Sequence, residues 1–133
     1  MKYLLPFLIL TVLISCKKKE VEHEPVEGLQ TITSKSQIDG EIADGVSMIF
    51  YHASWCTICQ DQRPAVTDVA QDESLSSVYF GEVEFDDHQD ITDAYNVSGF
   101  PTLVVYKDGS EVERLAGGGN STNTIKGKIT PYL

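Results

Sequence analysis

Two cysteines three positions apart are the residues of this sequence best suited to chemistry. Cys56 and Cys59 follow an apolar run, residues 46–51, and begin a stretch with a helical pattern that extends to about residue 72. The N-terminus of a helix has unpaired N–H groups and about half a positive charge. A thiolate on Cys56 is stabilised there, and Cys59, one turn further on, can form a disulfide with it. Because only the thiolate attacks a disulfide, the pair predicts thiol–disulfide exchange.

Two other roles are open to a Cys-x-x-Cys pair. It can form half of a zinc site, but such a site normally needs a second pair of ligands. The remaining candidate ligands form no second close-spaced pair, although His52 could act as a third ligand; they are His23, His52, His88 and Cys16. The pair could also be a structural disulfide, but so short a loop constrains the unfolded chain little. Redox exchange is therefore favoured, and we expect no metal and no cofactor.

Length, charge and cysteine content limit the number of domains and the classes of binding partner. The chain has 133 residues, 41% of them hydrophobic, which is enough for one small domain with a short extension. Its formal net charge of −10 opposes binding to nucleic acid or to an anionic membrane surface, since both are polyanions. Three cysteines are too few for a disulfide-stabilised scaffold.

The N-terminal residues indicate export. Residues 1–15 contain Lys2 and an apolar run that is too short for a stable membrane anchor, as in a signal peptide. Leu13-Ile14-Ser15-Cys16 resembles the lipobox of bacterial lipoproteins, which implies cleavage before Cys16 and lipid attached to this cysteine. An ordinary signal peptide with a chance cysteine is the alternative. Residues 16–28, with their many charges, would be a flexible tether.

From residue 29 onward, strand and helix patterns alternate. We expect strands near residues 29–33, 46–52, 77–85, 102–106 and 111–116, and helices near 34–43, 57–72, 91–95 and 121–130. The helix after the cysteines is expected to bury Ile58, Val66, Val69 and Ala70 and to contain Pro64. The order β-α-β-α-β-α-β-β-α predicts an α/β fold, with a central mixed sheet flanked by helices on both faces.

Residues 29–133 resemble the thioredoxin family. The matching segments are Trp55-Cys56-x-x-Cys59, the helix proline Pro64, Gly99-Phe100-Pro101-Thr102 before an apolar strand, and Lys107-Asp108-Gly109 with Gly117. A lone Cys-x-x-Cys is a modest signal, but the proline segment downstream makes it strong. The resemblance implies a thioredoxin-like fold and activity as a protein disulfide oxidoreductase.

The resemblance also implies roles for single residues. Cys56 would be the attacking thiolate, and Cys59 would resolve the mixed disulfide. Pro101 would follow a cis peptide bond beside the cysteines, and the backbone of Phe100 would pair with an extended substrate. Trp55 would form an apolar wall beside the sulfurs. The alternatives are a plain turn proline at Pro101 and an ordinary core position for Trp55.

Three positions depart from the family pattern. Phe50 replaces the buried aspartate that helps to deprotonate the second cysteine, and Glu82 replaces its lysine partner. We hypothesise that Glu82 supplies the acid–base function from the opposite side; a solvated carboxylate is the alternative. His52 replaces a family tryptophan. The dipeptide Thr57-Ile58 contains no histidine, and this favours a reductant over an oxidant.

The sequence therefore predicts an enzyme of the bacterial cell envelope, anchored by lipid and facing the periplasm or the outside. It would reduce or reshuffle disulfides in exported proteins and receive electrons from a membrane electron-transfer protein. We expect a monomer. Two alternatives are a non-catalytic module that binds peptides along the Pro101 edge and a thiol-based metal carrier.

Overall fold

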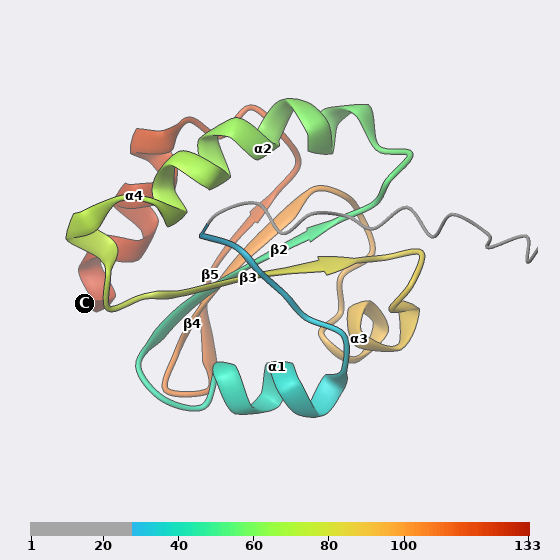
Figure 1. Ribbon diagram of the computed structural model, residues 1–133, viewed down its shortest axis with the longest axis horizontal. Coiled ribbons are helices and arrows are strands. Elements are labelled where there is room, and N and C mark those ends of the chain that lie inside the picture. Colours follow the sequence, from blue (N-terminus) through green and yellow to red (C-terminus); the bar gives the residue numbers. More distant parts are fainter. Residues whose placement is uncertain (1–27) are drawn as a thin grey trace, which may run out of the picture.

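A five-stranded sheet with helices on both faces forms the structure (Figure 1), a computed structural model that describes residues 28–133. The predicted signal peptide, Cys16 and most of the predicted tether lie outside the described residues. The element order matches the predicted one: β1 Gln30–Thr31, α1 Lys35–Glu41, β2 Val46–His52, α2 Thr57–Ala70, β3 Tyr79–Glu84, α3 Gln89–Ala94, β4 Thr102–Lys107, β5 Ser110–Ala116 and α4 Thr122–Ile129. Short 3-10 helices follow at Glu73–Leu75 and Thr130–Tyr132.

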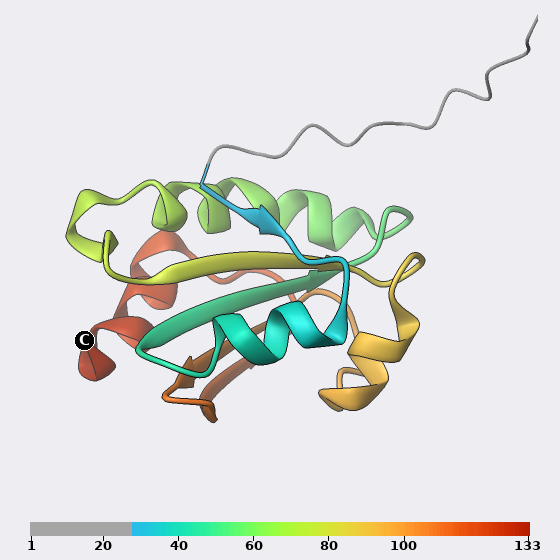
Figure 2. The ribbon, with the colours of Figure 1, turned by 60° about the horizontal axis from the view of Figure 1, so that its bottom comes forward.

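The sheet is mixed, in the order β1-β3-β2-β4-β5. Strands β1, β3 and β2 are parallel, whereas β4 runs antiparallel to both β2 and β5. Helices α2 and α4 cover one face and α1 and α3 the other, as the two views show (Figures 1 and 2). This arrangement confirms the predicted α/β class.

Strand β2 lies at the centre because its apolar run suits burial on both faces. All seven of its residues are buried. Met48 and Phe50 face the core under α2 and α4, whereas Ile49 and Tyr51 face the core over α1 and α3. Parallel pairing with β3 brings the C-terminal ends of both strands to one edge of the sheet. The residues that follow these ends build the candidate site.

Several local expectations need correction. Ile58 was predicted to be inward, but it is 56% exposed in the first turn of α2. Gln62 is buried on this helix instead. The helix expected to extend to residue 43 ends at Glu41, and Ala43 is exposed beyond it. The cap of α4 is Ser121, one of the two residues that the sequence suggests for it, the other being Asn120. Between residues 28 and 133, no helix is both long and apolar enough to cross a bilayer.

Candidate active site

Cys56 and Cys59 are joined by a disulfide at the N-terminus of α2. A turn at residues 53–55 leads from the buried strand β2 to Cys56, which is the N-cap of the helix. The Cys56 Sγ accepts the Cys59 backbone N–H at 3.1 Å. A thiolate on Cys56 is stabilised at this position by the unpaired N–H groups of the first helical turn.

An apolar, partly exposed surface borders the pair on its outward side. Trp55 is 64% exposed and meets Phe100 edge-on, with 6.3 Å between the ring centroids. Phe100 also packs on Phe85, at 4.8 Å. The Phe100–Pro101 peptide bond is cis, which confirms the prediction for Pro101. The alternative core position for Trp55 is wrong, because most of its side chain is in solvent.

Carboxylates from the end of β3 hold the turn that carries Trp55. Asp86 accepts the Trp55 indole N–H at 3.1 Å and the Ser54 hydroxyl at 3.0 Å. Glu84 accepts the Ser54 backbone N–H at 2.8 Å. The Trp55 indole, with the Ser54 hydrogen bonds, lowers the pKa of Asp86 below its usual value. An ionised Asp86 thus fixes the indole beside the sulfurs.

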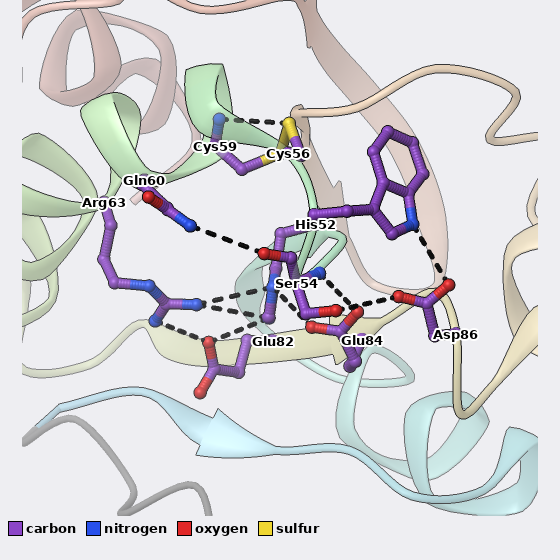
Figure 3. A network of polar contacts seen from close by, with 10 residues as sticks. His52, Ser54, Cys56, Cys59, Gln60, Arg63, Glu82, Glu84 and Asp86 are labelled. Atoms are coloured by element: carbon purple, nitrogen blue, oxygen red, sulfur yellow. Dashed lines mark hydrogen bonds and ion pairs between the residues drawn. A yellow bond between two sulfur atoms is a disulfide. The ribbon is translucent and has the colours of Figure 1, made fainter.

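On the inward side, buried charged groups lie near the position where the resemblance implies a buried aspartate, and Figure 3 shows three of them, His52, Arg63 and Glu82. Phe50 fills the position of that aspartate, and the Arg63 guanidinium lies over its ring, 5.2 Å from the centroid. Arg63 Nη1 donates to Glu82 Oε2 at 2.7 Å. His52 Nε2 lies 3.1 Å from the same oxygen, and His52 Nδ1 lies 3.0 Å from Glu84 Oε2. We call Arg63, Glu82 and His52 the charge cluster.

Glu82 is not the solvated carboxylate that the sequence left open, because its side chain is only 2% exposed. Burial raises the pKa of Glu82, but hydrogen bonds and charge from His52 and Arg63 outweigh burial and bring the pKa below its ordinary value. The carboxyl is therefore ionised at neutral pH. A group that stays ionised is a fixed charge rather than a ready proton donor, and the acid–base role of Glu82 stays a prediction.

The contacts of His52 bear on the metal-carrier alternative. Each ring nitrogen faces a carboxylate at about 3 Å, and the ring stacks on Phe50 with 5.0 Å between centroids. His52, considered above as a third metal ligand beside the cysteine pair, is thus directed to Glu82 and Glu84. In the part of the chain that the structure describes, no three His, Cys, Asp or Glu side chains are placed to hold a metal ion.

Two polar residues of α2 were not singled out from the sequence. Arg63 lies seven positions, or two helical turns, after Cys56, so helical periodicity could have placed it on the same face. Gln62 holds the loop before α4 by accepting the Asn120 N–H at 2.9 Å and donating to the Asn120 carbonyl at 2.7 Å. No sequence signal links Gln62 to Asn120, because the two are 58 positions apart.

Comparison with known proteins agrees with this geometry. The family model described as Thioredoxin matches residues 29–130. Thioredoxin from Chlamydia trachomatis is 33% identical over 95 residues, which cover 71% of this chain and 91% of that protein. Thioredoxin from Chlamydia caviae is 36% identical over 86 residues, covering 65% and 82%.

Solved structures show the same fold. A mutant thioredoxin from Halobacterium salinarum superposes with a TM-score of 0.71 at 26% identity, covering 81% of this chain and 93% of that one. The family model spans the whole described sheet, and the Cys56–Cys59 disulfide and the cis Pro101 lie inside the matched range. The chain therefore belongs to the thioredoxin family of thiol–disulfide oxidoreductases.

Proposed function

We propose that the protein is a lipid-anchored thiol–disulfide oxidoreductase of the bacterial cell envelope that reduces or reshuffles disulfides in exported proteins. The observation that carries this proposal is the coexistence in one chain of a lipobox, Leu13-Ile14-Ser15-Cys16, and a redox pair at Cys56 and Cys59. Acyl chains on Cys16 would give a stable anchor. Disulfides persist outside the cytoplasm, where such an anchor would place the domain.

The proposed exchange begins when the Cys56 thiolate attacks a disulfide of the substrate protein. A mixed disulfide forms between Cys56 and one substrate sulfur, while the other substrate sulfur leaves as a thiolate. Cys59 then attacks Cys56, which closes the Cys56–Cys59 disulfide and releases the second substrate thiolate. The substrate gains two electrons and the pair loses two, so an electron donor must reduce the pair again. We assign that supply to a membrane electron-transfer protein.

Surface features beside the pair support a polypeptide substrate. Between residues 28 and 133 three large hydrophobic side chains are exposed, and Trp55 and Ile58 flank the disulfide while Leu133 is at the C-terminus. No hydrogen bond within the described residues occupies the backbone of Phe100. An extended substrate could pair with this backbone as an added strand, with apolar contact to Trp55.

Two single substitutions separate anchoring from chemistry. The full chain is produced in a bacterium that makes lipoproteins, with labelled fatty acid in the medium, and membranes are separated from soluble protein. We expect the parent to be labelled and membrane-bound. Cys16→Ser should lose the label and its membrane association but keep exchange activity. Cys56→Ser should keep the label and the membrane association but lose exchange activity. An unlabelled parent, or a Cys16→Ser protein that stays labelled and bound, contradicts the anchor.

The direction of electron flow is tested by the reduction potential. The domain is equilibrated in glutathione or dithiothreitol buffers, and the fraction of Cys56–Cys59 disulfide is measured. A reduction potential of about −270 mV, as in thioredoxin, supports a reductant. A reduction potential of about −120 mV would make the protein a disulfide donor instead.

A further inference from the structure

The charge cluster of Arg63, Glu82 and His52 lies on the inward side of the redox pair, and the exchange steps above do not use it. Arg63 and Glu82 form a close ion pair, with 2.7 Å between Nη1 and Oε2. Their side chains are 22% and 2% exposed, so water screens this pair poorly. Figure 3 shows the Arg63 side chain extending from helix α2 away from the disulfide and toward Glu82 and His52, to which dashed lines join it.

Helix geometry places Arg63 on the same face of α2 as the two cysteines. Cys59 and Arg63 are four positions apart on α2, a spacing that sets Cβ atoms roughly 5–6 Å apart. Cys56 lies two turns before Arg63 on the same face. Phe50, whose ring the guanidinium covers, belongs to the same core cluster as both cysteines. A full positive charge is therefore held against the core cluster that also contains the two cysteines, within two helical turns of Cys56.

Stability alone does not explain such a cluster. Burying two ions costs several kcal/mol per ion in typical proteins, and apolar replacements of a buried pair are often neutral or stabilising. One oxygen of Glu82, Oε1, is buried and has no hydrogen-bond partner among the described residues. The hydrogen bonding of this buried carboxylate is therefore incomplete. The one nearby group whose charge changes during exchange is the Cys56 thiol. A fixed charge in a poorly screened position acts on that change.

We propose that Arg63 raises the reduction potential of the Cys56–Cys59 pair by stabilising the Cys56 thiolate through its charge, and that Glu82 limits this effect by partly neutralising Arg63. The inference rests on the proposed exchange function of the pair. Arg63 does not touch the reacting atoms, and it is a tuning residue. Its effect depends on pH, because only the thiolate form of the reduced protein carries the charge on which Arg63 acts.

The equilibrium that reports this effect is exchange with glutathione. Two glutathione thiols supply two electrons, the Cys56–Cys59 bond breaks, and glutathione disulfide forms. The two thiol protons pass to Cys56 and Cys59, or one passes to the buffer where Cys56 is a thiolate. The charged and titratable groups on this side of the sheet are Arg63 on α2, His52 on β2, Glu82 and Glu84 on β3, and Asp86 after β3.

The experiment compares Arg63→Met, Arg63→Lys and Glu82→Gln with the parent, measuring the glutathione equilibrium from pH 5 to pH 9. At pH 9 we expect Arg63→Met to favour the disulfide about tenfold more than the parent does, which corresponds to a potential about 30 mV lower. The difference should shrink toward pH 5, where both proteins are dithiols. Glu82→Gln should shift the equilibrium the opposite way, and Arg63→Lys, which keeps the charge, should stay close to the parent.

A second readout is the pKa of Cys56 in the reduced protein, followed by the rate of alkylation against pH. It should rise in Arg63→Met and fall in Glu82→Gln. Arg114→Met is the matched control, because Arg114 pairs with Glu111 and contacts backbone carbonyls at the end of α3. Its potential should equal that of the parent.

Potentials that do not differ among the folded variants, or that differ equally at every pH, overturn the inference while the exchange function stands. If Arg63→Met does not fold, Glu82→Gln and Arg63→Lys decide, because a higher potential in the first and an unchanged one in the second are both required. If the parent pair forms no reversible disulfide, the proposed function fails and this inference fails with it.

Discussion

The two sides of the Cys56–Cys59 pair are built from opposite chemistry. On the outward side, Trp55 and Ile58 expose more than half of their apolar side chains, at 64% and 56%. On the inward side, the charged Glu82 is only 2% exposed and His52 is only 4% exposed. Ordinary folding preferences would bury the apolar groups and expose the charged ones.

This inversion separates two tasks. Exposed apolar surface is suited to contact with another polypeptide, which covers it on binding. Buried charge acts over a longer distance than exposed charge, because a low dielectric weakens screening. Outward substitutions should therefore change the recognition of substrates, and inward substitutions should change the redox equilibrium and the stability.

Serine in place of either cysteine should have the largest effect on activity, and the two variants should fail differently. Cys56→Ser removes the attacking thiolate, so reduction of a protein disulfide should be undetectable and no mixed disulfide should form. Cys59→Ser keeps the attack but not the resolution, so a mixed disulfide with the substrate should accumulate and be visible by non-reducing electrophoresis. A trapped complex in Cys56→Ser instead would reverse the assigned roles.

Trp55→Ala tests the outward side. Loss of this exposed wall should lower kcat/KM for reduction of a polypeptide disulfide about tenfold, or about 1.4 kcal/mol, mainly through KM. The potential against glutathione should not change, because the charge cluster is intact. Leu133→Ala is the control, since Leu133 is also 55% exposed but is the C-terminal residue. A shift in potential equal to the loss in kcat/KM would mean that recognition and redox tuning are not separate.

The fold was largely predictable because its signals are local. The apolar run of β2, the turn residues Asp108 and Gly109, and the positions of Pro64 and Pro101 each specify nearby backbone. Element ends were less predictable. β3 begins at Tyr79, two residues later than expected, and α3 begins at Gln89, two residues earlier than expected. β3 starts where its pairing with β2 starts, with Tyr79 opposite Ser47, and α3 starts with the helical hydrogen bonds to the His88 carbonyl.

The inward side of the site was not predictable in the same way. The resemblance directed attention to Phe50 and Glu82, but the contact between Arg63 and Glu82 joins residues 19 positions apart on different elements. His52 was considered as a cysteine neighbour, and the structure directs both of its ring nitrogens to carboxylates. Such pairings depend on register and on side-chain direction, and neither leaves a periodic trace in the sequence.

The smallest effect we predict is in the stability of the inward side. Glu82 has a pKa below its ordinary value of 4.5 in the folded protein, so its ionised form stabilises the fold above about pH 4.5, and this contribution is lost as pH falls through the folded pKa. Glu82→Gln should lower the free energy of unfolding by about 1 kcal/mol at pH 7. The gap from the parent should close as the pH falls below 4.5.

Urea denaturation at pH 7, 5 and 3 measures this gap, with Glu73→Gln, an exposed glutamate, as the control that should show little change at any pH. A gap that stays constant from pH 7 to pH 3 would mean that packing, not the charge of Glu82, carries the stability. If the difference in free energy of unfolding disappears in acid, the ionised Glu82 carboxylate is what stabilises the fold. The same ionised carboxylate would then be the group that moderates the Arg63 charge.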